Sequence, residues 1–189
     1  RALYPEIPNL NWKALRIVCV YHDFGKMNSK FQNKIMKKLN EMGYEFELLE
    51  DEIGIDEIPH GYLSCAFLEE EKLKNEFSED DIRVIYQSIY YHHNRDPVDS
   101  LEISKIINSD MSIYLPDFNY LEYSVPDKLN PKYSKWVKKR ISKREYPENQ
   151  EMINQYIMVK GLLNRIDYSA SGDISVEKNH DNLYTKTIN

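Results

Sequence analysis

Apolar side chains recur every three or four residues through long stretches of this chain, a spacing that places them on one face of a helix. In Asn11–His22, for example, Trp12, Leu15 and Val18 share such a face. Few segments show the strict alternation of half-buried strands. Helices with one apolar stripe must bury it against one another, so the periodicity predicts an all-α fold.

Local signals suggest where the helices begin and end. Asn11 is a suitable cap, Gly25 follows the first helical segment, and Gly172 ends the last one. Ser78 and Asp81 have the spacing of a capping box. We expect helical segments at Asn11–His22, Lys30–Leu39, His60–Phe77, Ser78 to His92–His93, Ser100–Ile107 and Glu151–Ala170. Glu41–Pro59 and Met111–Pro131 are expected to be connections.

The size and composition predict one globular domain, at residues 1–172, followed by a polar tail or linker at residues 173–189. No apolar run approaches the length of a membrane span, so we expect no membrane partner. The two cysteines, Cys19 and Cys65, lie in apolar surroundings and are expected to be reduced.

Several potential metal ligands fall at the expected ends of helices. His22 and Asp23 end the first helix, His60 begins another, and His92–His93 end a third. Asp167 lies near the end of the last long helix. Imidazole and carboxylate groups converging between helices suit one or two divalent cations, which could clamp a phosphate and activate water for hydrolysis. From spacing alone, each histidine could equally be an ordinary core or surface residue.

The sequence around these residues resembles a known family. The string from His22 to Gln32 reads H-D-F-G-K-M-N-S-K-F-Q, followed by His60-Gly61-Tyr62-Leu63-Ser64, Tyr91-His92-His93 and the segment from Leu162 to Ser171. H-D-x-G-K is the signature of the HD superfamily of metal phosphohydrolases. The extension N-x-x-F-Q and the paired histidines resemble the HD nuclease of the CRISPR-associated helicase–nuclease of type I systems. This resemblance implies an HD-domain helical bundle with metal ligands converging from helix ends.

The resemblance also implies a ligand set of His22, Asp23, His60, His92, His93 and Asp167. His22, Asp23 and Asp167 would hold one metal, and Asp23 would bridge to a second held by the other three histidines. Lys26 would place a fixed positive charge beside the phosphate, although it could also be an exposed lysine past a helix end. Ser64 is a candidate supporting residue, or merely a buried serine bonded to its own helix.

One feature departs from the family pattern. The family has a further histidine upstream of the HD pair, and none precedes His22 here. We expect that segment to lie upstream of Arg1, outside the sequence given. Asp173 is a rival to Asp167, but it follows Gly172, and Asp167 is therefore preferred.

The charge is unevenly distributed, although its total is −6. From Lys132 to Arg144 there are seven basic residues and no acidic one. A nucleic-acid strand could bind here, its phosphates at Lys132, Lys135, Lys138, Lys139 and Arg140 and a base on Trp136. The alternative is a solvated amphipathic helix whose Trp136, Val137, Arg140 and Ile141 face covers the core. The acidic Glu41–Glu57 stretch is read as a soluble loop.

The functional hypothesis is a metal-dependent endonuclease or exonuclease that cuts single-stranded DNA in CRISPR interference, with Asp23 and Lys26 as catalytic residues. Two ions of manganese, nickel, cobalt or magnesium are implied. Because the histidine ligands must be neutral, we expect activity to fall below about pH 6. The alternatives are an HD-type nucleotide phosphohydrolase and a non-catalytic docking domain.

The resemblance implies partners as well. A helicase domain or subunit and the CRISPR effector complex are expected in the prokaryotic cytoplasm. No G-x-x-x-x-G-K-[ST] motif occurs in this sequence, so the helicase would be a separate region or protein.

Overall fold

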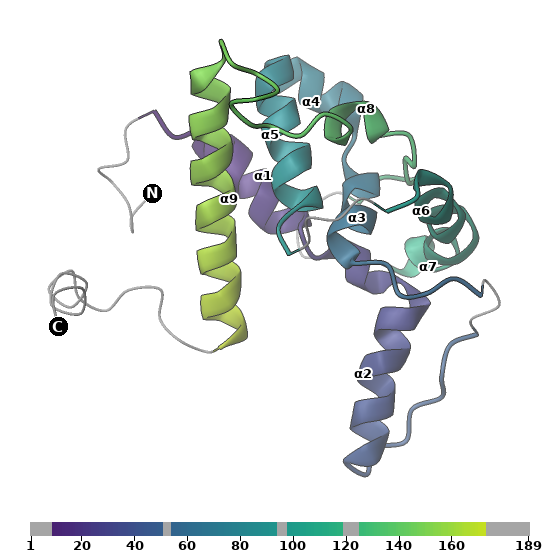
Figure 1. The fold of residues 1–189 in the computed structure, drawn as a ribbon. Helices are drawn as coiled ribbons and strands as arrows, with labels where there is room; N and C mark the ends of the chain where they lie inside the picture. The colour runs from purple at the N-terminus through teal and green to yellow at the C-terminus, as the bar shows by residue number, and fades with distance from the viewer. Residues whose placement is uncertain (1–8, 51–53, 94–97, 119–124, 173–189) are drawn as a thin grey trace, which may run out of the picture.

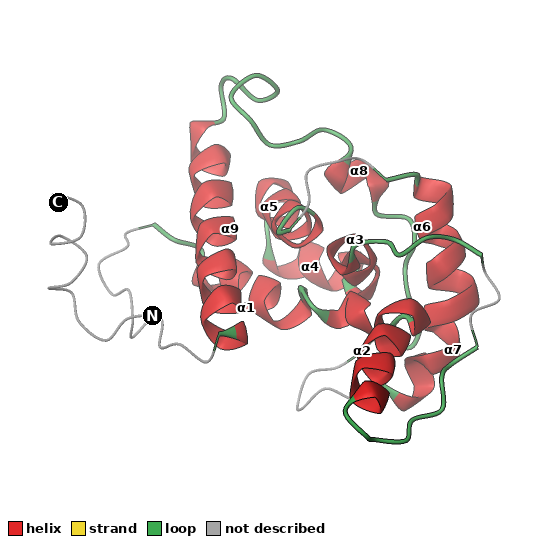
Figure 2. Ribbon diagram, turned by 60° about the horizontal axis from the view of Figure 1, so that its bottom comes forward, coloured by secondary structure: helices red, strands yellow, loops and turns green. Residues whose placement is uncertain are grey.

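A computed structural model describes residues 9–50, 54–93, 98–118 and 125–172, and all their regular structure is helical (Figures 1 and 2). The prediction of an all-α fold is therefore confirmed. The expected tail at residues 173–189 and Asp173 lie outside the described residues. Within the described ranges, no helix has the length and apolar character that a membrane crossing requires.

The regular elements follow in chain order. They are α1 (Trp12–Tyr21), η1 (Phe24–Met27), α2 (Ser29–Glu41), α3 (His60–Ser64), η2 (Cys65–Phe67), α4 (Glu70–Glu76), α5 (Glu79–Tyr90), α6 (Ser100–Ile106), η3 (Ile107–Met111), α7 (Ser112–Tyr114), η4 (Leu115–Asp117), α8 (Ser134–Val137) and α9 (Gln150–Ser171). The expected capping box of Ser78 and Asp81 is present at the start of α5, and Asn11 caps α1.

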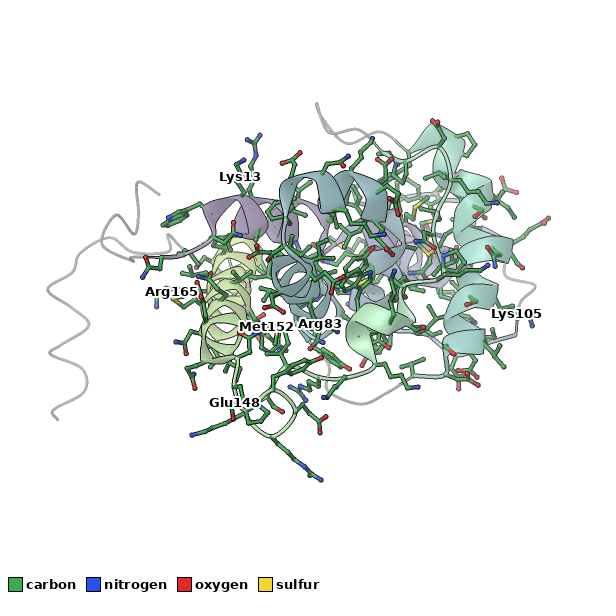
Figure 3. The ribbon with its side chains drawn as sticks, turned by 90° about the horizontal axis from the view of Figure 1, so that it is seen from above. Lys13, Arg83, Lys105, Glu148, Met152 and Arg165 are labelled. Atoms are coloured by element: carbon green, nitrogen blue, oxygen red, sulfur yellow. The ribbon has the colours of Figure 1, made fainter. Side chains whose placement is uncertain are left out.

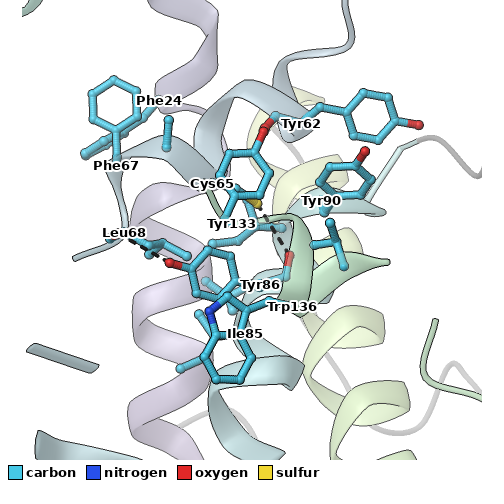
Figure 4. Packing of buried hydrophobic residues seen from close by; sticks show 14 of the residues in the cluster. Phe24, Tyr62, Cys65, Phe67, Leu68, Ile85, Tyr86, Tyr90, Tyr133 and Trp136 are labelled. Carbon is cyan, nitrogen blue, oxygen red and sulfur yellow. Dashed lines mark hydrogen bonds between the residues drawn. The ribbon is translucent and has the colours of Figure 1, made fainter. Parts of the chain in front are cut away.

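Helix α5 lies at the centre of the domain. It packs against α1 and α9 on one side and against α3 and α8 on the other (Figure 1). Every residue from Val84 to Tyr90 is buried, which explains why this helix is apolar on more than one face. Tyr86 stacks on Trp136 with ring centroids 5.9 Å apart (Figure 4). The other helices are thus positioned by their contacts with α5.

The prediction of one helix over His60–Phe77 was wrong, because the chain turns at Leu68 between η2 and α4. The break has a long-range cause. The Tyr133 hydroxyl donates a hydrogen bond to the carbonyl of Tyr62, and the Asn130 N–H donates to that of Ala66 at 2.9 Å. A continuous helix would use both carbonyls for its own hydrogen bonds, so donors from distant residues end the helix here.

Two further boundaries differ from expectation. The segment predicted as a connection from Met111 begins with the helical turns η3, α7 and η4. The basic stretch forms only the single turn α8, although its Trp136, Val137 and Ile141 are buried, as the core-covering alternative expects.

Helix α2 projects from the body, and residues 42–50 run back along it (Figure 1). Two asparagines of α2 fix this returning segment. The Asn33 amide both donates to the Leu49 carbonyl and accepts from the Leu49 N–H, at 2.9 and 2.8 Å. Asn40 pairs with the backbone of Phe46 in the same way, at 2.9 and 2.7 Å. We call α2 and residues 42–50 together the arm, because these hydrogen bonds hold the returning segment against the helix.

We predict that Gln87→Leu strongly destabilises the domain. The buried Gln87 amide donates to the carbonyls of Trp136 and Lys139 and accepts from the N–H of Ile141, at 2.7–2.9 Å. Leucine would leave these backbone groups unpaired, so the free energy of unfolding should fall by about 3 kcal/mol. Urea denaturation measures it. The exposed control Gln150→Leu should change it by less than about 0.5 kcal/mol, and equal losses in both variants would contradict the prediction.

Candidate metal centre

His22 and Asp23 lie at the junction of α1 and η1. The N–H of His22 still bonds to the Val18 carbonyl, so the ring is placed by the last turn of α1. Nδ1 of His22 lies 2.8 Å from the carbonyl of Cys19, which assigns the ring proton to Nδ1 in the neutral imidazole. Nε2 then carries a lone pair, and this buried atom has no hydrogen-bond partner among the described residues.

Two carboxylates face this lone pair. Asp23 Oδ2 and Asp167 Oδ1 each lie 3.6 Å from His22 Nε2. Asp167 comes from α9 and is largely buried. A nitrogen lone pair turned toward two carboxylate oxygens is electrostatically unfavourable unless a cation lies between them. This first group of three ligands therefore fits a metal ion.

The second group joins α3 to the end of α5. His60 is the first residue of α3, and its Nε2 lies 3.1 Å from Nε2 of His92. Nδ1 of His92 is 2.6 Å from the carbonyl of Ile89, which again leaves Nε2 as the free nitrogen. The His93 ring lies 4.0 Å from that of His92 and 5.1 Å from that of His60, between centroids.

In each group, one ligand atom per residue lies within 4.8 Å of the other two. Asp23 connects the groups, because its Oδ1 lies 3.1 Å from His60 Nε2 while its Oδ2 faces His22. Asp167 Oδ2 is also 3.5 Å from His93 Nε2. The donor set of imidazole nitrogens and carboxylate oxygens suits divalent transition metals. The structure thus brings together all six predicted ligands, whose role as ligands stays a prediction.

The environment keeps His92, His93 and Asp23 in their metal-binding protonation states. Burial lowers the pKa of His92 to about 3 and also lowers that of His93, so both rings are neutral at physiological pH. Burial alone would raise the pKa of Asp23, but His60 and Lys26 beside it hold the pKa well below its usual value. Asp23 is therefore ionised.

Lys26 is the cation nearest to this carboxylate. Its Nζ lies 2.7 Å from Asp23 Oδ2, and its side chain is 32% exposed. Three residues of the N-x-x-F-Q extension hold its turn: Asn28 donates to the Gly25 carbonyl at 2.6 Å, Gln32 donates to the Lys26 carbonyl at 2.7 Å, and the Phe31 ring lies 5.6 Å from Nζ.

Ser64 connects the HD turn to α3. Its hydroxyl donates to the carbonyl of His22 at 2.6 Å and accepts from the N–H of Gly25 at 2.8 Å. These hydrogen bonds match the supporting role considered from the sequence, rather than a bond to its own helix. A Cβ on Gly25 would lie 2.1 Å from the carbonyl oxygen of His60, and one on Gly61 would lie 2.7 Å from the His92 ring. From the sequence, Gly25 was expected only to end the first helical segment, and Gly61 was given no role.

The basic stretch lies apart from the ligands. Trp136 is only 4% exposed and stacks on Tyr86, so its ring is not available for stacking on a base, contrary to the expectation. Lys132, Lys135, Lys138 and Lys139 are all exposed; Lys135 pairs with Glu70 at 2.5 Å and Lys139 with Glu145 at 3.8 Å. Arg140 lies over the ring of Tyr91, 5.0 Å from its centroid.

Arg83 is a cation that the sequence analysis missed. It lies on α5 beside α8, over the rings of Trp136 and Tyr146 (Figure 3). Together with Lys138, Lys139 and Arg140 it lines a shallow basic groove. Because Arg83 is far from the basic stretch in the sequence, no local pattern indicated that the two would lie side by side.

Comparison with protein-family models gives a match over residues 9–156 to the family described as "Cas3, HD domain". The match includes five of the six expected ligands, and Asp167 lies beyond it. No curated protein and no solved structure matches the chain significantly.

We predict that Gly25→Ala disrupts the centre, because its Cβ must displace the backbone at His60. The free energy of unfolding should fall by about 3 kcal/mol, and manganese affinity, measured by calorimetry, should fall with it. Gly161→Ala is the matched control. Nothing lies within 4 Å of a Cβ there, in the middle of α9, so that variant should gain up to about 1 kcal/mol. Similar behaviour of the two variants would contradict the prediction.

Proposed function

Because this chain belongs to the Cas3 HD-domain family, we propose that it cuts single-stranded DNA at a centre of two divalent metal ions during CRISPR interference. The family is one of CRISPR-associated, HD-type metal-dependent nucleases. Single-stranded DNA as the substrate, the number of ions and the roles of individual residues belong to the proposal.

One observation carries the proposal: two groups of three ligands meet at a single carboxylate. His22, Asp23 and Asp167 form one group and His60, His92 and His93 the other, with Asp23 Oδ1 3.1 Å from His60 Nε2. A carboxylate in this position has one oxygen for each ion. Divalent ions bound there would activate a water for attack on phosphorus and neutralise charge on the phosphate.

The protein residues prepare this chemistry before any substrate binds. The carbonyls of Cys19 and Ile89 fix the rings of His22 and His92, so that Nε2 of each points inward. Asp23 stays ionised beside Lys26. We assign Lys26 to a non-bridging phosphate oxygen, because its Nζ is partly exposed at the rim of the ligand set.

The basic groove supports a nucleic-acid substrate. Arg140 lies over the ring of Tyr91, the residue that precedes His92 in the chain, and this contact supports a path for the strand from the groove to the ligands. A strand held at Lys138, Lys139 and Arg140 would pass along α5 toward the ligands. Lys132 and Lys135 remain candidates at the edge, and Arg83 replaces Trp136 as a structural element of this surface.

We infer manganese, nickel, cobalt or magnesium as the ions, with the histidine-rich set favouring the transition metals. A helicase region or subunit, an effector complex and a prokaryotic cytoplasmic setting complete the proposal. A nucleotide phosphohydrolase and a non-catalytic docking domain are the competing hypotheses.

We predict that the protein linearises and then degrades circular single-stranded DNA with manganese, and that EDTA abolishes the reaction. Gel electrophoresis follows the circles, which only an endonuclease can open. Asp23→Ala should reduce the rate at least a hundredfold because both ions lose a ligand. The control Asp56→Ala, an exposed carboxylate in a loop, should match wild type.

The competing hypotheses predict other results. Hydrolysis of mononucleotides without DNA cleavage would indicate a nucleotide phosphohydrolase. Absence of both activities, with well under one metal ion per chain after purification, would indicate a docking domain. Because burial lowers the pKa of His92 to about 3 and also lowers that of His93, activity retained at pH 5 would be compatible with the histidine ligand set, in contrast to the fall below about pH 6 expected from the sequence.

We predict that the triple variant Lys138→Gln, Lys139→Gln, Arg140→Gln raises the KM for single-stranded DNA several-fold. The dependence of binding on salt should also weaken, by about one unit of log–log slope for each phosphate that the protein no longer neutralises. Lys37→Gln with Lys38→Gln, on the exposed side of α2, is the control and should retain the wild-type slope. An unchanged slope in the triple variant would exclude the groove.

A further inference from the structure

A cavity of about 520 Å³ opens directly beside the HD turn. Its lining includes His22, Asp23 and Lys26, the groups that the proposed function places around the phosphate. It also includes apolar side chains, which we call the apolar wall: Val20, Phe24, Met27, Leu49, Tyr114 and Phe118. A cavity lined by both charged and apolar groups fits a ligand that carries a phosphate and an aromatic ring.

The apolar wall is assembled from distant parts of the chain and is held in place. Leu49 lies on the returning segment of the arm, and both its backbone groups are bonded to Asn33. Phe118 packs edge-on against Phe24, with ring centroids 5.2 Å apart, and lies 5.6 Å from Phe67. The wall is therefore preorganised and needs no folding on binding.

The cavity also offers aromatic faces and a polar group. Tyr114 and Phe118 are only half-buried, so parts of their rings face the opening. Gln32 lines the same space, and its Nε2 is engaged by the Lys26 carbonyl. Its Oε1 accepts no hydrogen bond from the described residues, which leaves it available to an N–H donor on a ring.

We infer that this cavity takes the nucleobase next to the phosphate being cut. The inference rests on the proposed function, because it uses the phosphate position at Asp23 and Lys26. Bases carry a flat aromatic face and an N–H donor, on the ring in thymine and guanine or on an exocyclic amine in adenine and cytosine, and these groups match the aromatic side chains and Gln32. A base in a duplex is stacked and paired and must leave the helix to enter such a cavity. The cavity would thus favour single strands over duplexes.

An oligothymidylate with one abasic residue tests this directly. With manganese, cleavage at every phosphate is mapped by end-labelling and compared with the unmodified strand. Loss of the base should slow cleavage about tenfold at one of the two phosphates flanking the gap. Changes of less than twofold at both positions would overturn the inference while leaving the nuclease proposal intact.

A second test fills the cavity. Leu49→Trp retains the backbone bonds to Asn33 but places an indole in the space. Leu48→Trp is the matched control, because Leu48 is the neighbouring residue, is exposed and does not line the cavity. Leu49→Trp should lower kcat/KM on single-stranded DNA about tenfold, and Leu48→Trp should not. Both variants should bind manganese as wild type does, which shows that the centre is intact.

A binding measurement separates failure of this inference from failure of the proposed function. Fluorescence anisotropy of a labelled oligothymidylate, with calcium in place of manganese, reports occupancy without cleavage. Leu49→Trp should bind about fivefold more weakly than Leu48→Trp, even if the protein proves to have no nuclease activity. Equal affinities would overturn the inference and would indicate that the cavity receives something else, such as an apolar side chain of a protein partner.

Discussion

The candidate metal centre depends on how closely two backbone segments approach each other at Gly25. The turn after α1 lies directly on α3, with no room for a side chain between Gly25 and the carbonyl of His60. The Ser64 hydroxyl holds the two segments together, because it donates a hydrogen bond to the His22 carbonyl and accepts one from the Gly25 N–H. Because His22 and Asp23 are on one segment and His60 is on the other, the close approach determines the spacing of ligands from both groups.

Helix α5 extends the same arrangement to the remaining ligands. Its buried residues fix it against α1 and α9, so its end presents His92 and His93 to the turn, and α9 presents Asp167. The buried amide of Gln87 forms hydrogen bonds with three backbone groups of the basic stretch, which therefore do not need water as a partner. The cluster of charged and imidazole groups thus rests on helices whose apolar side chains are buried in the core.

The sequence was sufficient for features that depend on local order. Helical periodicity, the capping box at Ser78 and the run of family motifs predicted the fold class and a ligand set that the structure assembles. It was insufficient where distant residues compete. The helix after His60 ends early because Tyr133 and Asn130 take its carbonyls, and Trp136 is buried because Tyr86 lies opposite it. Neither contact can be predicted from the residues close by in the sequence.

The cavity wall shows the same limit, since Leu49 and Tyr114 are ordinary residues until the chain brings them beside Lys26. The arm that carries Leu49 has a mechanical consequence. Asn33 and Asn40 form hydrogen bonds with the returning segment at two separate points along α2, so the helix and the segment should move together. Asn28 caps the N-terminus of α2, and its side chain also donates a hydrogen bond to the Gly25 carbonyl. A force on the tip of the arm should therefore act, through α2 and Asn28, on the turn that carries Lys26.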